Sequence, residues 1–325
     1  QRRAGEPAHG PAAAAEGLLM RIHHLNCGTC CPVGGRLFDG GSASPFARLV
    51  CHCLLIESDA GLILVDTGFG TRDVARPRGR LSPFFLALNN IQLRPEETAL
   101  AQVRRLGFDP LDVRHIVISH LDFDHAGGIE DFPHAAIHLL ADEADAASHR
   151  RGGMMGSRRY RPQQWDEVEA WRCYRPGEGE RWFGFEAVRD LDGLPPEVLL
   201  IPLMGHTWGH SGVAIRETTD GSGGGWLFYA ADAYFYRGEI GSHRYHCPPG
   251  LRAYQTMMEV DRTARLTNQA RLRRLSLAHE GEVRIFCAHD AVEFDILAGQ
   301  ATCRSDANGQ PSAAPALQVK VGAPE

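Results

Sequence analysis

The residue types best suited to metal chemistry stand together at positions 120–125, where the sequence reads HLDFDH. Imidazole nitrogens and carboxylate oxygens are the ligands that zinc, iron and manganese take in proteins. Four such side chains within six positions would be costly to bury without a compensating cation. The motif follows the apolar stretch 113–119 and precedes Ala126-Gly127-Gly128, so we place it on a loop at a strand end, where functional residues gather. The pattern predicts a metal centre rather than a polar surface loop.

Four further segments also carry an aspartate or a histidine that could bind or orient a metal ion. They are Asp66 in LVDTG, His206 in MGHTWGHSG, Asp232 in YAADAY and His289 in FCAHD. The chain holds 16 histidines, several beside Asp, Gly or another His, and this composition also points to metal chemistry.

Taken in order, these five features resemble the metallo-β-lactamase superfamily over roughly residues 20–299. Within it the chain is most similar to the N-acyl-homoserine lactonases, through residues 97–133 and the stretch GHTWGHSG. The resemblance implies an α/β fold, an αββα sandwich in which two packed mixed β-sheets carry helices on their outer faces. It also implies a dinuclear metallo-hydrolase.

The resemblance further implies two metal sites that share a bridging carboxylate. The implied ligands are His120, Asp122 and His206 at the first site, Asp124, His125 and His289 at the second, and Asp232 between them. Asp66 is then a carboxylate behind the ligands that orients one of the histidines, and His210 is a structural neighbour.

The first motif departs from the family pattern H-x-H-x-D-H, because Asp122 stands where a histidine is usual. Asp122, Asp124, Asp232 and one hydroxide together carry −4, which cancels two divalent ions at +4, whereas the usual set would leave +1. A neutral centre would raise the pKa of its water. We therefore expect two divalent metal ions, zinc first, with manganese or iron favoured by the extra oxygen ligand. The alternative is that the short Asp122 does not reach, and the first site is weak or empty.

The implied reaction is the opening of a lactone or related ester by a metal-bound hydroxide, with Asp124 passing the proton to the leaving group. Lactonases place a tyrosine near the bridging acid, and Tyr234 and Tyr236 are both candidates, with ordinary packing as the alternative. Phe123 and Trp208 stand inside the two histidine motifs and are expected to line the substrate pocket.

Other functions on the same fold remain open. A thioesterase of the glyoxalase II kind would need a cationic pocket, which the arginines of 150–161 could supply, although solvated surface is their default interpretation. An iron-dependent redox or oxygen enzyme is a second alternative. A binding protein that has lost catalysis is a third.

Composition limits the partners and the location. The net charge of −6 gives no attraction to nucleic acid, and the apolar runs are too short to span a membrane. We expect a small-molecule substrate and a cytoplasmic protein, and leave a homodimer open because 160–185 is aromatic. The nine cysteines are expected to be reduced, partly buried thiols, with the role of Cys27, Cys30, Cys31, Cys51 and Cys53 unassigned.

The elements that must position these residues follow from hydrophobic periodicity. Strands are expected at 21–26, 48–57, 61–66, 113–119, 135–140, 198–202, 212–216, 226–230 and 282–288, and helices at 95–106, 141–149, 251–279 and 291–299. Residues 68–90 are expected to form a loop, and 150–184 an irregular insertion near the site. The predicted hydrolase domain covers 20–300, with mobile segments at 1–19 and 301–325.

Overall fold

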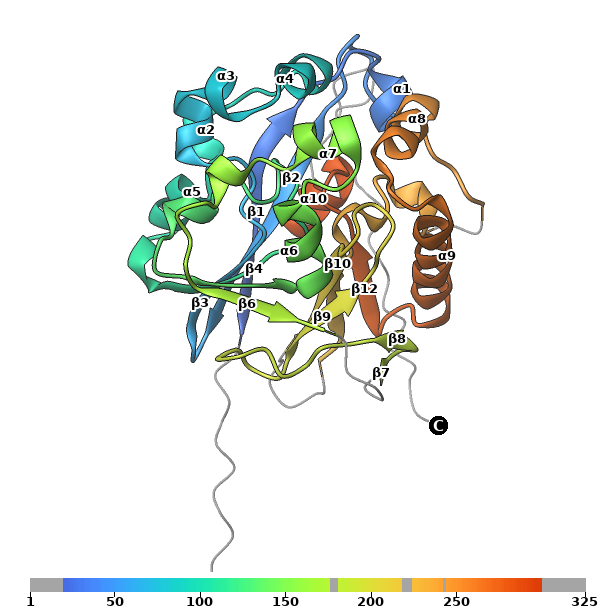
Figure 1. The fold of residues 1–325 in the computed structure, drawn as a ribbon. Coiled ribbons are helices and arrows are strands. Elements are labelled where there is room, and N and C mark those ends of the chain that lie inside the picture. Colours follow the sequence, from blue (N-terminus) through green and yellow to red (C-terminus); the bar gives the residue numbers. More distant parts are fainter. Residues whose placement is uncertain (1–19, 176–180, 218–223, 242–243, 300–325) are drawn as a thin grey trace, which may run out of the picture.

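The computed structural model describes residues 20–175, 181–217, 224–241 and 244–299 (Figure 1). The segments 1–19 and 301–325, for which mobility is predicted, lie outside the described residues. Two β-sheets pack face to face, and helices cover their outer sides (Figure 1). This order of layers confirms the predicted αββα sandwich.

The first sheet is built mainly by the N-terminal half of the chain. Its strands, in spatial order, are β1 (Arg21–Cys30), β2 (Leu49–Ser58), β3 (Gly61–Val65), β4 (Val113–Val117), β5 (Ala136–Leu140) and β6 (Trp171–Tyr174). Pairing is antiparallel from β1 to β3 and parallel from β3 to β6, so the sheet is mixed.

The second sheet is built by the C-terminal half. Its strands, in spatial order, are β12 (Val283–Phe286), β11 (Trp226–Tyr229), β10 (Ser211–Arg216) and β9 (Val198–Pro202). β11 and β12 are parallel, while β10 is antiparallel to both of its neighbours. A separate small pair is formed by β7 (Arg181–Trp182) and β8 (Phe185–Glu186).

The alternation of side chains along each strand produces the layers. On β2, Leu54 and Ile56 point to the seam between the sheets, where they pack with Val213 and Ile215 of β10. Leu55 points the other way, into the core under the helices that cover the first sheet. Strands whose side chains are buried on both faces read as continuous apolar runs, as LILV in β3 does.

The longer helices flank the sheets. They are α5 (Ala99–Arg105) and α6 (Ala141–Ser148) on the first sheet, α9 (Arg262–Ala278) on the second, and α8 (Pro249–Met258) and α10 (Ala291–Leu297) nearby (Figure 1). The shorter ones are α1 (Arg36–Asp39), α2 (Thr71–Ala75), α3 (Pro77–Arg80), α4 (Pro83–Asn89) and α7 (Gly153–Arg159). Single turns of 3-10 helix lie at Pro95–Glu97, Pro110–Asp112, Ile129–Asp131, Pro162–Gln164, Ala231–Ala233 and Arg237–Glu239.

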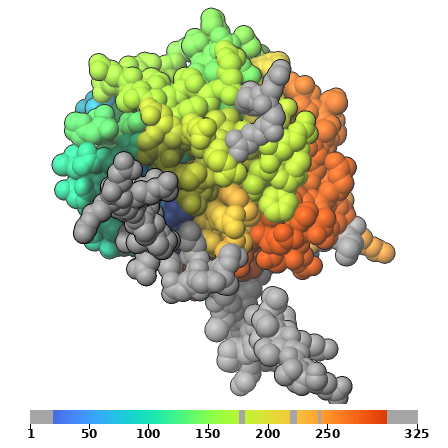
Figure 2. Space-filling view, turned by 90° about the horizontal axis from the view of Figure 1, so that it is seen from below, coloured from blue at the N-terminus to red at the C-terminus, as the bar shows by residue number. Residues whose placement is uncertain are grey.

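The structure differs from the sequence prediction in three segments. The expected loop 68–90 contains α2, α3 and α4. The expected helix 251–279 is two helices, because Asp261 is extended and its side chain accepts the Ala264 N–H as the N-cap of α9. The expected insertion 150–184 supplies α7 and the edge strand β6. The described residues between β6 and β9 lie at the lower end of the molecule, where they form part of the face in yellow-green (Figure 2).

A membrane-spanning helix is not found among the described residues, since none of their helices combines the necessary length with sufficient apolar character.

Gly68, directly after Asp66-Thr67, provides a test of how tightly the first sheet packs. Its φ is +63°, and an added Cβ would overlap the carbonyl oxygen of Cys27 on β1. We expect Gly68→Ala to lower the free energy of unfolding by more than about 1 kcal/mol in urea titrations. Gly107→Ala is the control, because φ is +90° there but no atom lies within 4 Å of the added Cβ. Equal losses in the two variants would contradict the close approach.

Candidate metal centre

The predicted ligands meet at one end of the sandwich because each follows the C-terminal end of a strand. His120 to His125 follow β4, His206 follows β9, Asp232 follows β11 and His289 follows β12. β4 lies in one sheet and the other three strands in the second sheet, so the residues gather over the seam. The structure thus brings together seven side chains that are spread over 170 positions of the sequence, from 120 to 289.

The first cluster consists of His120, Asp122 and His206, with one oxygen of Asp232. Asp122 Oδ2 lies 3.5 Å from His120 Nε2 and 3.1 Å from His206 Nε2. Asp232 Oδ2 lies 3.7 Å and 3.2 Å from the same two nitrogens. All four side chains are buried. The alternative that Asp122 is too short to reach therefore does not agree with the structure.

The second cluster consists of His125 and His289, with the other oxygen of Asp232. Asp232 Oδ1 lies 3.4 Å from His125 Nε2 and 3.1 Å from His289 Nε2. Asp124 is more distant, with its Oδ2 at 3.9 Å from His289 Nε2. Asp232 Oδ2 also lies 3.3 Å from His289 Nε2, so the carboxylate stands between the two clusters, where a bridging ligand would lie.

The residues present fit divalent metal ions. An ion with bonds of about 2.1 Å in tetrahedral geometry places its ligands roughly 3.4 Å apart, which matches most of these separations. His120 Nε2, His125 Nε2 and Asp232 Oδ1 are buried and have no hydrogen-bond partner among the described residues. Buried polar atoms are normally paired, so three unpaired atoms aimed at one space indicate a missing cation.

The charges of the buried side chains also favour a divalent cation at this centre. Burial opposes protonation of His289, but Asp232 and Asp124 raise the pKa of His289 to about 9. Burial and the neighbouring His125 lower the pKa of His120 to about 4, so its Nε2 keeps a free lone pair. The carboxylates thus favour positive charge beside them, which a bound divalent cation would supply.

Asp66 orients His125 of the second cluster through a hydrogen bond to its Nδ1. Its Oδ2 accepts hydrogen bonds from Ser119 Oγ at 2.6 Å, Tyr229 Oη at 2.7 Å and His125 Nδ1 at 2.8 Å, and its Oδ1 accepts the Ser119 N–H at 2.8 Å. The Nδ1–H of His125 is thereby fixed, and Nε2 faces Asp232. The residue has a φ of +56°, which is uncommon outside glycine and asparagine. This is the orienting position that the resemblance implied for Asp66.

His210 has no nitrogen left for a metal. Its Nδ1 donates to the carbonyl oxygen of Leu203 at 3.0 Å, and its Nε2 accepts the backbone N–H of Asp232 at 3.0 Å. Both bonds are buried. The structural role expected for His210 agrees with this geometry.

Arg159, at the end of α7, is the main correction to the sequence-based picture of the site. It was grouped with arginines expected on solvated surface, yet it is 1% exposed. Its Nε and Nη2 donate to the two oxygens of Asp122, each at 2.7 Å, and Nη1 donates to the Met258 carbonyl at 2.9 Å. Nη2 also lies 3.0 Å from His206 Nε2. Asp122 is therefore shared between the first cluster and a buried guanidinium.

The guanidinium changes the predicted charge of the centre. The count that gave zero omitted Arg159, and adding its positive charge gives +1, the value expected of the usual ligand set. The Asp122–Arg159 pair thus carries the same net charge as the neutral histidine it replaces. The neutral count, and the less acidic water expected from it, therefore hold only if the charge of Arg159 is left out.

Removing Arg159 should leave a buried, unpaired carboxylate. We expect Arg159→Met to lower the free energy of unfolding by about 3–5 kcal/mol in urea titrations with a chelator present. The matched control is Arg158→Met on the same helix, where the guanidinium stacks on Phe84 at 4.6 Å and holds no buried acid. Its loss should stay below about 1 kcal/mol. Similar losses in both variants would show that Asp122 does not depend on Arg159.

A small cavity of about 140 Å³ reaches the centre at His289. Apolar side chains form much of its wall, namely Phe38, Leu49, Phe235, Tyr236 and Leu251. Two arginines also line it, but both are paired, Arg48 with Asp295 and Arg237 with Asp290. This cavity is the candidate substrate pocket.

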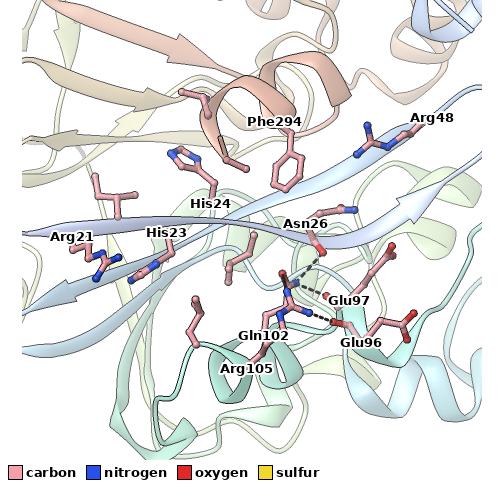
Figure 3. A pocket seen from close by; sticks show the side chains of 15 residues that line it. Arg21, His23, His24, Asn26, Arg48, Glu96, Glu97, Gln102, Arg105 and Phe294 are labelled. Carbon is pink, nitrogen blue, oxygen red and sulfur yellow. Dashed lines mark hydrogen bonds between the residues drawn. The ribbon is translucent and has the colours of Figure 1, made fainter. Parts of the chain in front are cut away.

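A larger cavity of about 520 Å³ lies beside β1, α5 and α10, away from the centre (Figure 3). Its wall carries both signs of charge, with Glu96 and Glu97 beside Arg105 on one side and Arg21 on the other, and Gln102 donates to the Asn26 carbonyl oxygen at 2.9 Å. None of the predicted site residues lines it, so it has no part in the candidate site.

Of the aromatic residues expected to contact the substrate, only some lie at the small cavity. Tyr236 lines the small cavity. Tyr234 is fully buried and its hydroxyl donates to Glu293 at 3.0 Å, away from the metal residues. Phe123 is 1% exposed and its ring packs on Phe85 with centroids 4.8 Å apart, so it supports the loop rather than lining a pocket. Trp208 is 40% exposed and lines neither cavity.

Tyr254 on α8 lies near the small cavity and was missed by sequence reasoning. Its hydroxyl accepts the Asn89 side-chain N–H at 3.1 Å, and its ring lies 6.1 Å from that of Phe235, a residue of the small cavity. Burial and the charge of Asp124 raise its pKa, so the phenol stays protonated and can donate. No motif marks it, because it lies on a helix 22 positions after Asp232.

Glu293, the partner of Tyr234, should make stability depend on pH. It accepts the Cys287 N–H at 2.9 Å, and burial with the nearby Asp290 raises its pKa to about 8. The folded protein then binds a proton that the unfolded chain releases near pH 4.3, so stability falls as pH rises from about 4.3 through 8. Glu293→Gln should flatten this fall, measured by urea unfolding between pH 5 and 9. An unchanged slope would contradict the raised pKa.

Comparison with known proteins gives a consistent result. A family model described as the metallo-beta-lactamase superfamily matches residues 47–231. A Mycobacterium tuberculosis protein named a probable metallo-hydrolase is 39% identical over 281 residues, covering 86% of this chain and 84% of that protein. The N-acyl homoserine lactonase AiiA of Bacillus thuringiensis subsp. kurstaki is 30% identical over 205 residues, covering 63% of this chain and 73% of the lactonase.

One solved structure shows the same fold. It is that of an N-acyl homoserine lactone hydrolase with the product N-hexanoyl-L-homoserine at its catalytic metal centre. Its TM-score is 0.61 and its identity 22%, with 85% of this chain and 95% of that chain covered.

Proposed function

The chain belongs to the metallo-β-lactamase superfamily, and on that premise we propose that it is a dinuclear metallo-hydrolase that opens a lactone or a related ester. The observation that carries the proposal is the position of Asp232, whose carboxylate oxygens lie 3.1–3.7 Å from histidines of both clusters. The lactonase names of several relatives support the substrate class.

The chain's own residues have distinct tasks in this reaction. Divalent ions, zinc first, would supply Lewis acidity that polarises a carbonyl oxygen and makes a neighbouring water more acidic. Burial raises the pKa of Asp124 although His125 and His289 act in the opposite direction, so its carboxylate can take a proton from the attacking water and pass it to the ring oxygen. Tyr254, protonated and near Asp124, can donate a hydrogen bond to the substrate.

The small cavity favours a lactone over the thioester alternative. Phe38, Leu49, Phe235 and Leu251 give its wall an apolar part, which suits an acyl chain. A glutathione-like carboxylate would need an unpaired cation, but Arg48 and Arg237 already bind Asp295 and Asp290. Arg159, from the basic segment that kept the thioesterase alternative open, is used by Asp122.

The test is acid release in a pH-stat from a panel of N-acyl-homoserine lactones and simple γ- and δ-lactones. We expect metal-dependent turnover that falls at least about 100-fold in Asp232→Ala, because loss of the shared carboxylate uncouples the clusters. Asp192→Ala is the control, since that acid pairs with Arg172 on the surface. Wild-type turnover in Asp232→Ala would refute the mechanism. Absence of turnover in metal-replete protein would refute the lactone substrate and move thioesters ahead of it.

A further inference from the structure

Cys51 on β2 lies against the second cluster, although no motif includes it. Its sulfur, a carboxylate oxygen of Asp124 and a ring nitrogen of His289 all lie within 4.8 Å of one another. The side chain is 1% exposed. Two bonds to one zinc ion, about 2.1 Å from nitrogen or oxygen and about 2.3 Å from sulfur, span at most about 4.4 Å. A small side-chain movement therefore brings these three atoms onto one ion.

The backbone fixes Cys51 relative to His289. His289 Nδ1 donates to the carbonyl oxygen of Val50 at 2.8 Å, so its Nε2 is turned toward the centre. The N–H of His52 donates to the carbonyl oxygen of Ala288 at 2.9 Å. Cys51 thus lies between Val50 and His52, which both hydrogen-bond to the segment that carries His289. These hydrogen bonds fix Cys51 next to His289 without a substrate.

The second cluster has fewer close donor residues than the first. Its close members are His125, His289 and Asp232, whereas Asp124 lies 3.9 Å from His289. His125 Nε2 and Asp232 Oδ1, 3.4 Å apart, are buried and have no hydrogen-bond partner in the described part of the chain, and Asp232 Oδ1 also lies 3.1 Å from His289 Nε2. These unpaired atoms are evidence for a cation that is independent of the cysteine.

We propose that Cys51 binds the second metal ion as a thiolate, in addition to the histidines and acids of that site. On binding, the S–H bond breaks, a metal–sulfur bond forms, and the proton leaves to solvent. A thiolate favours zinc over manganese, while the first cluster offers only nitrogen and oxygen. The two sites then differ in metal preference, with the softer ion held beside β2. This inference rests on the metal centre of the proposed function but not on its substrate.

The test is cobalt substitution followed by absorption spectroscopy. Chelator-treated full-length protein is reduced, kept free of oxygen and titrated with Co²⁺. Thiolate ligation gives an intense near-ultraviolet charge-transfer band, whereas histidine and carboxylate ligands give only weaker visible bands. We expect both sets of bands in the wild type. Cys51→Ser should lose the charge-transfer band and keep the visible bands, which also report that the variant is folded.

The matched control is Cys30→Ser, because Cys30 lies on the neighbouring strand β1 and its thiol hydrogen-bonds that of Cys51. This variant should keep the charge-transfer band. If Cys30→Ser removes it and Cys51→Ser does not, the ligand is Cys30 and the proposal is overturned. Visible bands without a charge-transfer band in the wild type would overturn it too, while leaving the metal centre intact. Absence of all cobalt bands would instead remove the metal centre and the proposed function with it.

A second measurement concerns metal preference. Competition with a chromophoric chelator gives the affinities for Zn²⁺ and Mn²⁺ separately. Cys51→Ser should weaken the tighter Zn²⁺ binding about 10- to 100-fold and change Mn²⁺ binding much less. Equal changes for the two ions would contradict sulfur ligation.

Discussion

Asp66, Asp122, Asp124 and Asp232 are among the carboxylates buried at one end of the sandwich, and the manner in which each of these four is neutralised determines the rest of the site. Asp66 accepts hydrogen bonds from the Nδ1–H of His125 and from the hydroxyls of Ser119 and Tyr229. Asp122 accepts hydrogen bonds from Nε and Nη2 of Arg159. Asp232 is surrounded by histidines of both clusters. Asp124 is left with a single ion pair in the described residues, 3.9 Å from His289. Isolated buried charge is too costly to keep, so this least-compensated acid is the one that must gain a proton or a cation.

The two sheets contribute to this arrangement unequally. The first sheet provides a rigid frame, in which the loop after β4 is held by Asp66, Ser119 and Thr67 through buried hydrogen bonds. The second sheet provides ligands one at a time, from the ends of three different strands. Function therefore depends on the packing of the seam, because the distance between His125 and Asp232 is set by how the sheets meet rather than by any local turn.

The grouping of the candidate ligand residues could be predicted because their spacing and their place after apolar strands are local features of the sequence. Arg159 could not, since nothing in an arginine-rich segment distinguishes the one side chain that turns inward. Tyr234 was misplaced because proximity in sequence to Asp232 does not determine direction, and its extended backbone sends the hydroxyl to Glu293. Cys51 was interpreted as a core thiol, which its burial supports, but its nearness to His289 arises from strand contacts that span 238 positions.

The ring of His210 ties the Leu203 carbonyl on one side to the Asp232 amide on the other. The loop that presents His206 and the turn that presents Asp232 are consequently parts of one rigid unit. In the dinuclear centre that we propose, Asp232 would serve both clusters, so an ion bound in one half would act on an oxygen that the other half needs. Thermodynamic reciprocity would then link the two metal affinities by the same factor in both directions. Metal loading of such a centre would be cooperative, with a sign set by whether the first ion draws the shared carboxylate toward the second space or away from it.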